Sequence, residues 1–172
     1  DQSTICAIST SPGMGAIAVI RLSGEKAISI ADKLFRSPQK DKSLLKQKAN
    51  TLHFGQIVFK DEVVDEVVVS LFKAPHSFTG EDIVEISCHG SVYIQQNLLE
   101  IFVENGARLS RPGEFTQRAF LNGKMDLSQA EAVADVIASS NTAAHKLAIS
   151  QMRGGFSKEI GELRDQLLHF TA

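Results

Sequence analysis

The chain has 172 residues, of which 43% are hydrophobic and 22% charged, and its formal net charge is −2. This composition is typical of a folded globular protein, and it excludes both a disordered chain and a strongly basic nucleic-acid-binding domain. Any contact with RNA therefore has to come from a local patch or from other parts of a larger assembly.

The first part of the chain predicts two strands and a helix. Short apolar runs at Ser3–Ile8 and Ala16–Leu22 predict strands joined by a tight loop. Ser23 is a predicted N-cap, because a serine side chain accepts bonds from the first free N–H groups of a helix. The apolar residues of that helix recur at helical spacing: Ala27, Ile28, Ala31, Leu34 and Phe35. The lysine-rich segment Ser37–Asn50 favours a solvated loop over a phosphate-binding patch.

The middle of the chain predicts more strands and a second helix. Thr51–Phe59 and Val63–Phe72 are rich in β-branched and aromatic residues and predict a hairpin, and Asp82–Cys88 predicts a further strand. A helix face follows, which Asn105-Gly106 ends before a short strand at Ala107–Ser110. The apolar residues of that face are Val92, Leu98, Leu99 and Phe102. This mixture of strands and helices predicts an α+β domain.

After Pro112 the pattern is helical throughout. Glu114–Leu121 predicts a short helix, and Asp126 with Gln129 predicts a capping box for the next one. The buried stripe expected on that second helix is Leu127, Ala130, Val133 or Ala134, and Ile137. A third helix is expected from Asn141 or Thr142, and we expect it to continue to the last residue. Its apolar seam, which requires a partner helix, is Phe156, Ile160, Leu163, Leu167 and Phe170.

Motifs for catalysis, metals and nucleotides are missing from the sequence. There is no G-x-x-x-x-G-K-[ST] loop and no G-x-G-x-x-G before a suitable helix, so we do not expect this chain to bind GTP or a dinucleotide. The five histidines show no metal-ligand spacing. Cys88 and His89 are adjacent and should lie on opposite faces of a strand. With Cys6, Cys88 is expected to be a buried free thiol. No catalytic residue and no metal site are predicted.

A charged residue within a strand is the main candidate for ligand binding. Glu85 lies between two apolar neighbours, and either a structural salt bridge or ligand recognition accounts for it. A carboxylate accepts two parallel hydrogen bonds from a flat group with adjacent N–H donors, such as the amino-pyrimidinone edge of a pterin. Arg21, Arg118 and Lys124 are the cations expected to pair with Glu85 or to face an anionic ligand tail, the alternative being ordinary surface charges.

Three ordered blocks of sequence carry a resemblance to a known family. They are the segments 16–24, 77–90 and 111–132, and the third, which begins Arg111-Pro112-Gly113-Glu114, is long and specific. Together they resemble the tRNA modification GTPases called MnmE or TrmE. The resemblance implies an α+β domain over 1–120, similar to the tetrahydrofolate-binding domain of the glycine-cleavage aminomethyltransferase. It implies the first helices of a central helical bundle over 121–172, with the GTPase domain absent.

The resemblance also implies ligands and partners. The folate-contacting positions correspond to Arg21, Glu85 and Lys124, and the ligands are 5-formyl-tetrahydrofolate and 5,10-methylene-tetrahydrofolate. The N-terminal domain forms a homodimer. Complete members bind GTP, Mg and K at sites absent here, and they modify C5 of the wobble uridine of certain tRNAs with the FAD-dependent partner MnmG (GidA). A cytoplasmic protein without a membrane segment is expected. The sequence departs from the family pattern at Ser11 and Ser91, and Ser91 is expected to narrow a close backbone approach or to cap the next helix.

Two other interpretations of the chain are open at this point. One is a dimerisation module whose folate pocket is incomplete in this chain. The other is an independent folate-dependent one-carbon transferase, which the absence of an evident nucleophile or acid–base pair disfavours.

Overall fold

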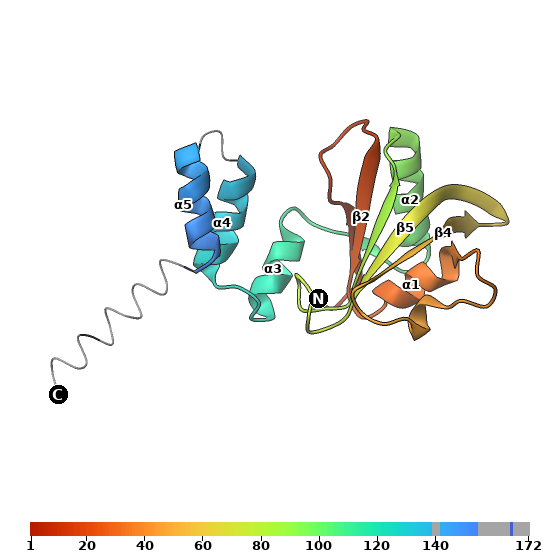
Figure 1. The fold of residues 1–172 in the computed structure, drawn as a ribbon, viewed down its shortest axis with the longest axis horizontal. Coiled ribbons are helices and arrows are strands. Elements are labelled where there is room, and N and C mark those ends of the chain that lie inside the picture. Colours follow the sequence, from red (N-terminus) through yellow and green to blue (C-terminus); the bar gives the residue numbers. More distant parts are fainter. Residues whose placement is uncertain (139–141, 155–165, 167–172) are drawn as a thin grey trace. The chain divides into compact units, whose positions relative to one another are not determined.

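The computed structural model describes residues 1–138, 142–154 and 166, which form two compact units, 1–118 and 119–172. Figure 1 shows the elements of both units in chain order. The division falls inside helix α3 (Glu114–Leu121). The domain boundary expected after residue 120 stays a prediction, and the two units are described separately.

A seven-stranded mixed sheet organises the first unit. Its strand order is β3-β4-β5-β6-β2-β1-β7, and within it only β1 and β7 pair in parallel among the described residues. The strands are β1 (Ile5–Ile8), β2 (Ile17–Ser23), β3 (Phe35–Arg36), β4 (Thr51–Phe59), β5 (Glu62–Phe72), β6 (Ile83–His89) and β7 (Arg108–Leu109). The sheet and its helices confirm the predicted α+β fold.

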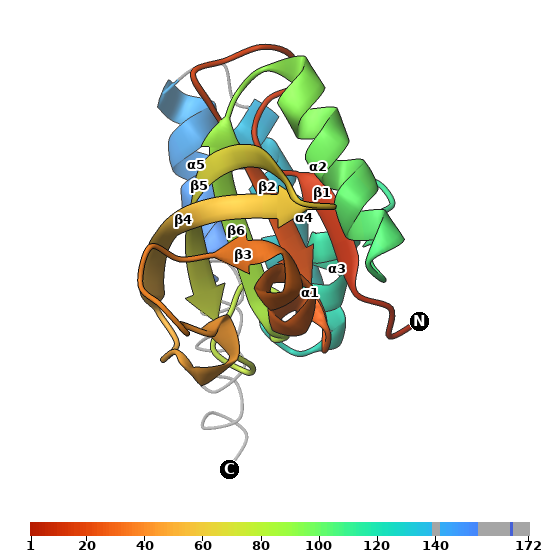
Figure 2. The ribbon, with the colours of Figure 1, turned by 90° about the vertical axis from the view of Figure 1, so that its right-hand side faces the viewer.

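One face of this sheet carries the hydrophobic core. Helices α1 (Ala27–Leu34) and α2 (Val92–Glu104) pack there, as Figure 2 shows. Side chains alternate along a strand, so in β6 Val84, Ile86 and Cys88 enter the core whereas Glu85 lies on the opposite face. The same alternation in the neighbouring strand β2 places Ala18, Ile20 and Leu22 in the core. The charged candidate on β6 is therefore outside the core, on the second face of the sheet.

Turn chemistry confirms the hairpin and corrects one helix cap. Lys60 and Asp61 both have positive φ, 51° and 63°, as a two-residue hairpin turn requires. Ser23 is not an N-cap, because it ends β2 and its hydroxyl lies 2.7 Å from the hydroxyl of Thr79. The N-cap of α1 is Lys26, whose side chain makes no capping bond. The serine signal was correct for α2, where the Ser91 hydroxyl accepts a bond of 3.0 Å from the N–H of Ile94.

The segment predicted as a solvated loop is more ordered than expected. It contains the short 3-10 helix η1 (Leu44–Lys46), and the side chain of Leu44 is fully buried in the core. The carboxylate of Asp32 in α1 accepts bonds from the N–H of Leu44 at 2.8 Å and from the Ser43 hydroxyl at 3.2 Å. A buried leucine and the carboxylate of Asp32 thus order a segment whose other residues are mostly polar.

The second unit contains α4 (Leu127–Ala138) and α5 (Thr142–Met152). The predicted capping box is confirmed, since Asp126 and Gln129 each accept a bond from the other's backbone N–H, at 2.8 and 3.0 Å. The predicted stripe is wrong at its two ends, because Leu127 and Ile137 are 60% and 81% exposed, whereas Ala130 and Val133 are half-buried. The buried positions are Ala132 and Ala148, which let the backbones of α4 and α5 approach closely. The expected seam from Phe156 to Phe170 lies outside the described residues.

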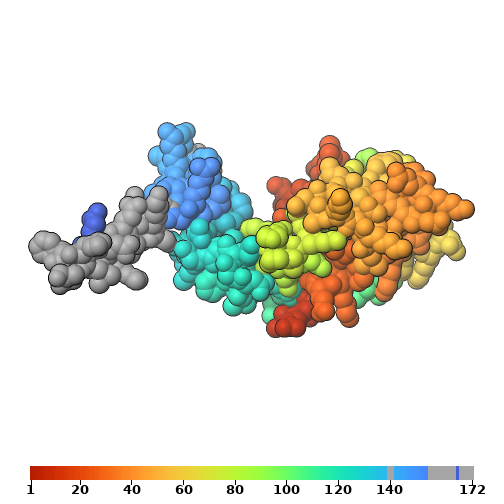
Figure 3. Space-filling view, turned by 60° about the horizontal axis from the view of Figure 1, so that its bottom comes forward, coloured from red at the N-terminus to blue at the C-terminus, as the bar shows by residue number. Residues whose placement is uncertain are grey.

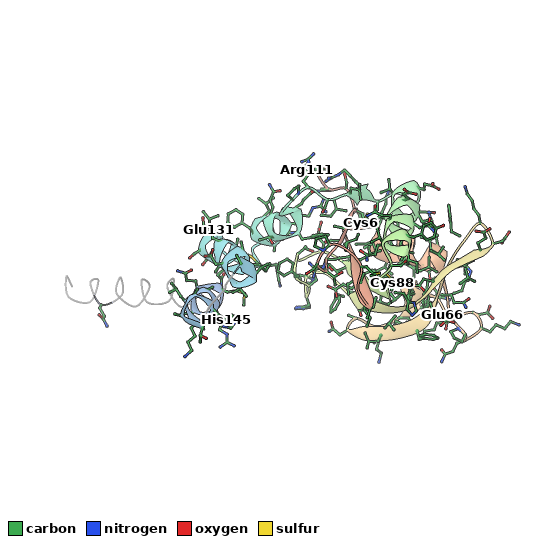
Figure 4. The ribbon with its side chains drawn as sticks, turned by 90° about the horizontal axis from the view of Figure 1, so that it is seen from above. Cys6, Glu66, Cys88, Arg111, Glu131 and His145 are labelled. Atoms are coloured by element: carbon green, nitrogen blue, oxygen red, sulfur yellow. The ribbon has the colours of Figure 1, made fainter. Side chains whose placement is uncertain are left out.

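Both cysteines are buried free thiols, as expected, and Figure 4 labels them within the fold. Burial raises the pKa of Cys6 and of Cys88 to about 11. Since the thiolate is the reactive form, we expect neither residue to react with a disulfide reagent such as DTNB at pH 8 in the native protein. Both should react in 6 M guanidinium. Rapid native labelling of either thiol would contradict the burial described here.

Candidate functional site

An arginine–glutamate pair lies on the second face of the sheet, where β2 and β6 are neighbours. Arg21 and Glu85 are directly opposite in the antiparallel register. The Nε and Nη2 atoms of Arg21 both donate to the same carboxylate oxygen, Oε1 of Glu85, at 3.1 and 3.0 Å. The two side chains are 23% and 28% exposed. Oε2 of Glu85 has no protein partner among the described residues, so this oxygen remains available to a ligand.

Two phenylalanine rings flank the guanidinium of Arg21. Its central carbon lies 5.4 Å from the ring centroid of Phe78 and 5.3 Å from that of Phe115. Phe78 belongs to the loop between β5 and β6, and Phe115 to the first turn of α3. Cation–π attraction and the rings' bulk restrict the guanidinium. Glu85 is therefore bound by an arginine whose movement the two rings restrict.

The loop that supplies Phe78 is itself tied down by polar contacts. The Ser23 hydroxyl, at the end of β2, contacts the Thr79 hydroxyl at 2.7 Å and donates to the Glu81 carboxylate at 2.8 Å. Arg118 binds both oxygens of Glu81, at 3.1 and 3.2 Å. The N–H of Ala74 donates to the Asp82 carboxylate at 2.8 Å. These contacts give the loop one conformation beside Arg21.

A buried glutamate at the start of α3 organises the cations around Phe115. Glu114 is 5% exposed and receives bonds from Arg108 at 3.0 and 2.7 Å and from the N–H of Arg111 at 2.8 Å. Arg118, one turn later, approaches it at 3.5 Å. The hydrogen bonds from Arg108, with those from the Arg111 N–H and the charge of Arg118, lower the pKa of Glu114 to about 2 against the opposing effect of burial. The network holds the helix turn that carries Phe115.

A shallow apolar hollow lies on the same sheet face as Glu85, beginning two residues further along β6. Its volume is about 290 Å³. Its lining comes from four strands and is Ile17, Phe54, Glu66, Val67, Val68, Ser87, Cys88 and His89. The face thus offers a charged group and an apolar surface side by side, which is the usual composition of a ligand site.

The structure brings two of the three predicted folate residues together. Arg21 is the partner of Glu85, whereas Arg118, considered for that role, binds Glu81 and Glu114 instead. Lys124 lies in the second unit, where its backbone N–H donates to the carbonyl of Ala119 at 2.8 Å. Its assignment to the site stays a prediction.

Sequence reasoning missed Phe78, Phe115 and Glu114 as parts of this site. All three lie within the blocks that carried the family resemblance, but an aromatic residue beside a loop is usually read as packing. Glu114 directly precedes Phe115, and Glu81 follows Phe78 three residues later, but neither spacing predicts a shared site. Their meeting around Arg21 depends on long-range contacts that spacing does not reveal.

Metal and membrane features were searched for in the described ranges. Within 1–138 and 142–154, no group of three or more His, Cys, Asp or Glu side chains is placed to hold a metal ion. His89 is exposed and bound to Asp65 at 2.8 Å, while Cys88 faces the core, so the two point apart as expected. No helix in these ranges is long and apolar enough to cross a membrane.

Comparison with known proteins gives matches along the whole chain. Residues 4–124 match the family model described as "GTP-binding protein TrmE N-terminus", and residues 127–172 match the "MnmE helical domain". A protein of Parabacteroides distasonis named "tRNA modification GTPase MnmE" is 63% identical over 172 residues, covering 99% of this chain and 37% of that protein. Proteins of the same name from Flavobacterium johnsoniae and Porphyromonas gingivalis are 57% and 51% identical, with 37% and 36% of their lengths covered.

The chain thus spans a little over a third of the length of these relatives. Both family models match in the expected order, and the first alone covers more than half of the chain. The matches include every block on which the resemblance was based. The chain belongs to the TrmE/MnmE family of tRNA modification GTPases and corresponds to its N-terminal domain and part of its helical domain.

Proposed function

We propose that this chain is the folate-binding and dimer-forming part of a tRNA-modifying GTPase, with 5-formyl- or 5,10-methylene-tetrahydrofolate as its ligand. The observation that carries the proposal is the half-buried carboxylate of Glu85, one oxygen of which binds Arg21 while the other has no partner among the described residues. A carboxylate held in this way suits the adjacent N–H donors of a pterin ring.

The surroundings of Glu85 support a flat, partly apolar ligand. The rings of Phe78 and Phe115 border the pair, and the 290 Å³ hollow extends the same face along β6. The role of this chain's own residues is to orient the carrier and to exclude water from it. A folate supplies the one-carbon unit when bound. Lys124 is proposed as the third contact, where its ammonium suits the anionic end of the ligand.

In the complete protein, the unit transferred would end at C5 of the wobble uridine of certain tRNAs. We place the GTP, Mg and K sites in the part of the relatives that this chain does not span, and we propose an FAD-dependent protein of the MnmG type as the partner. The chain itself would contribute position and dimer symmetry in the cytoplasm.

Two alternative functions, a dimerisation module and an independent one-carbon transferase, can each be distinguished from this proposal by one measurement. A pure dimerisation module would form dimers without binding folate. An independent one-carbon transferase would need a nucleophile or an acid–base pair near Glu85. Arg21, which contacts Glu85, and Glu81, four residues before it in the chain, are both engaged in ion pairs.

Calorimetric titration of the 172-residue chain with 5-formyl-tetrahydrofolate tests the proposal, with sedimentation of the same sample reporting its oligomeric state. We expect saturable binding with one ligand per chain, and a dimer. A dimer that binds no folate would favour the dimerisation module. Release of a one-carbon unit from methylene-tetrahydrofolate without any partner would favour the independent transferase.

A further inference from the structure

The positive charge of the first unit is concentrated in one segment. Residues 33–48 carry six of the chain's 18 lysines and arginines and one of its 20 acidic residues, a net charge of +5 against −7 for all other residues. The cations are Lys33, Arg36, Lys40, Lys42, Lys46 and Lys48. An acidic protein therefore contains one local surface that attracts polyanions, which its overall charge conceals.

The lysines of this segment are free of carboxylate partners. Among the described residues, none of the five has an acidic side chain within ion-pair distance, although ion pairs occupy Arg21, Arg108 and Arg118. Four of the lysines are exposed and Lys42 is half-buried. Like charges within sixteen residues of chain repel one another, so a bound anion would lower the electrostatic energy of this segment.

The segment is also held in one conformation. Leu44 inserts into the core, and Asp32 fixes the two residues that begin η1. Lys73, the residue after β5, donates to the carbonyl of Gln47 at 2.7 Å. At the other end, Arg36 is paired into the sheet through β3. The lysines of residues 33–48 thus extend from an ordered backbone, which lowers the conformational entropy lost when a ligand binds.

The position of the segment suits a large ligand rather than the folate itself. It begins at β3, the edge strand of the sheet, and β3 lies four strands from β2, which carries Arg21. At about 4.8 Å per strand, β3 and β2 are about 19 Å apart, while the other end of the segment lies beside the end of β5, where Lys73 binds Gln47. Figure 3 shows this segment, in orange, at the surface of the first unit. The cations are spread over sixteen residues, which suits an extended polyanion better than a small ligand.

We propose that the surface formed by residues 33–48 binds the phosphate backbone of the RNA substrate. This inference rests on the proposed function, because a tRNA is the polyanion that such a protein has to hold near its one-carbon carrier. Lysine side chains contact phosphates as point charges, without reading bases. The surface therefore supplies affinity and orientation, and the choice of tRNA is made elsewhere.

The test compares two triple variants of the chain with the same change in net charge. One is Lys40→Ala, Lys46→Ala, Lys48→Ala within the surface, and the control replaces the exposed residues Lys26, Arg111 and Lys146 by alanine. Binding of a fluorescein-labelled tRNA transcript, with uridine at the wobble position, is followed by anisotropy between 50 and 200 mM KCl. Vesicles containing 30% phosphatidylserine serve as the competing polyanion.

We expect the surface variant to bind tRNA roughly 100-fold more weakly at 100 mM salt, with a salt slope smaller by about 2 to 3, because each lost phosphate contact releases about one counterion less. The control variant should bind as the unaltered chain does. Equal losses in the two variants, no binding by the unaltered chain, or preference for the vesicles would each overturn the inference.

Folate titration of the same samples separates this inference from the proposed function. The surface variant should bind 5-formyl-tetrahydrofolate normally, since Lys40, Lys46 and Lys48 form no hydrogen bond or ion pair with Arg21 or Glu85 in the described part of the chain. An unaltered chain that binds tRNA but not 5-formyl-tetrahydrofolate would refute the folate proposal alone. An unaltered chain that binds 5-formyl-tetrahydrofolate but not tRNA would refute the RNA surface alone.

Discussion

Replacing Glu85 by glutamine is expected to weaken binding of 5-formyl-tetrahydrofolate by about 100-fold or more. The amide keeps the shape of the side chain but removes the negative charge and turns one acceptor into a donor. A hydrogen bond to a charged group contributes about 1.5 to 3 kcal/mol, and an amide N–H facing a ligand N–H adds a further cost, so we expect a loss of about 3 kcal/mol. Calorimetric titration measures the change directly.

A matched control distinguishes ligand recognition from a general loss of charge. Glu62→Gln makes the same substitution at an exposed position of β5, far along the hairpin from Glu85, and should leave affinity unchanged. The Glu85→Gln variant should also keep its thermal midpoint within a few degrees, because Arg21 is part-exposed and flanked by two rings. Normal folate affinity in Glu85→Gln would show that this carboxylate has a structural role only.

Glu114→Ala is expected to lower the free energy of unfolding by about 3 kcal/mol. The substitution removes the acceptor of two arginines and of one backbone N–H from a position that is 5% exposed. Breaking a buried ion pair by deleting one partner typically costs about 3 to 5 kcal/mol, because the remaining charge is left without compensation. Urea denaturation of the variant and the unaltered chain measures the difference. A loss below about 1 kcal/mol would show that water replaces the carboxylate without cost.

The same residue makes stability depend on pH in a defined window. The pKa of Glu114 falls from 4.5 in the unfolded chain to about 2 in the native one, so its contribution is complete above pH 4.5 and is lost as pH decreases from 4.5 towards 2. This loss should be reduced in Glu114→Gln, which has no proton to take up. Denaturation midpoints measured between pH 6 and pH 3 test the difference. Parallel curves for the two proteins would contradict the assignment.

Several local features could be predicted from the sequence because their causes are local. Apolar periodicity located the β4–β5 hairpin and α3, and the pairing of Asp126 with Gln129 located the start of α4. The burial of both cysteines followed from their residue type. Family resemblance added what periodicity does not contain, and the matches with two family models confirm the family.

The errors arose where a residue's role depends on distant neighbours. Ser23 has the chemistry of an N-cap, but the strand extends to it and the loop at Thr79 takes its hydroxyl. Leu127 and Ile137 have helical spacing, yet α4 packs through alanine because a small residue permits closer contact. In both cases the local preference was real and a tertiary contact provided the larger stabilisation.

The sequence by itself determined the α+β class and the family, and it singled out Glu85 as a residue for either a salt bridge or ligand recognition. Only the tertiary structure decided which cation this carboxylate binds, since the sequence offered more than one cation for it. The register of β2 against β6 places Arg21 opposite Glu85, while the start of α3 directs Arg118 to Glu81 and Glu114. Arg21 and Glu85 attract each other strongly only because their side chains lie about 3 Å apart. The two residues are 64 positions apart in the sequence, so their distance depends on the fold and cannot be read from composition or periodicity.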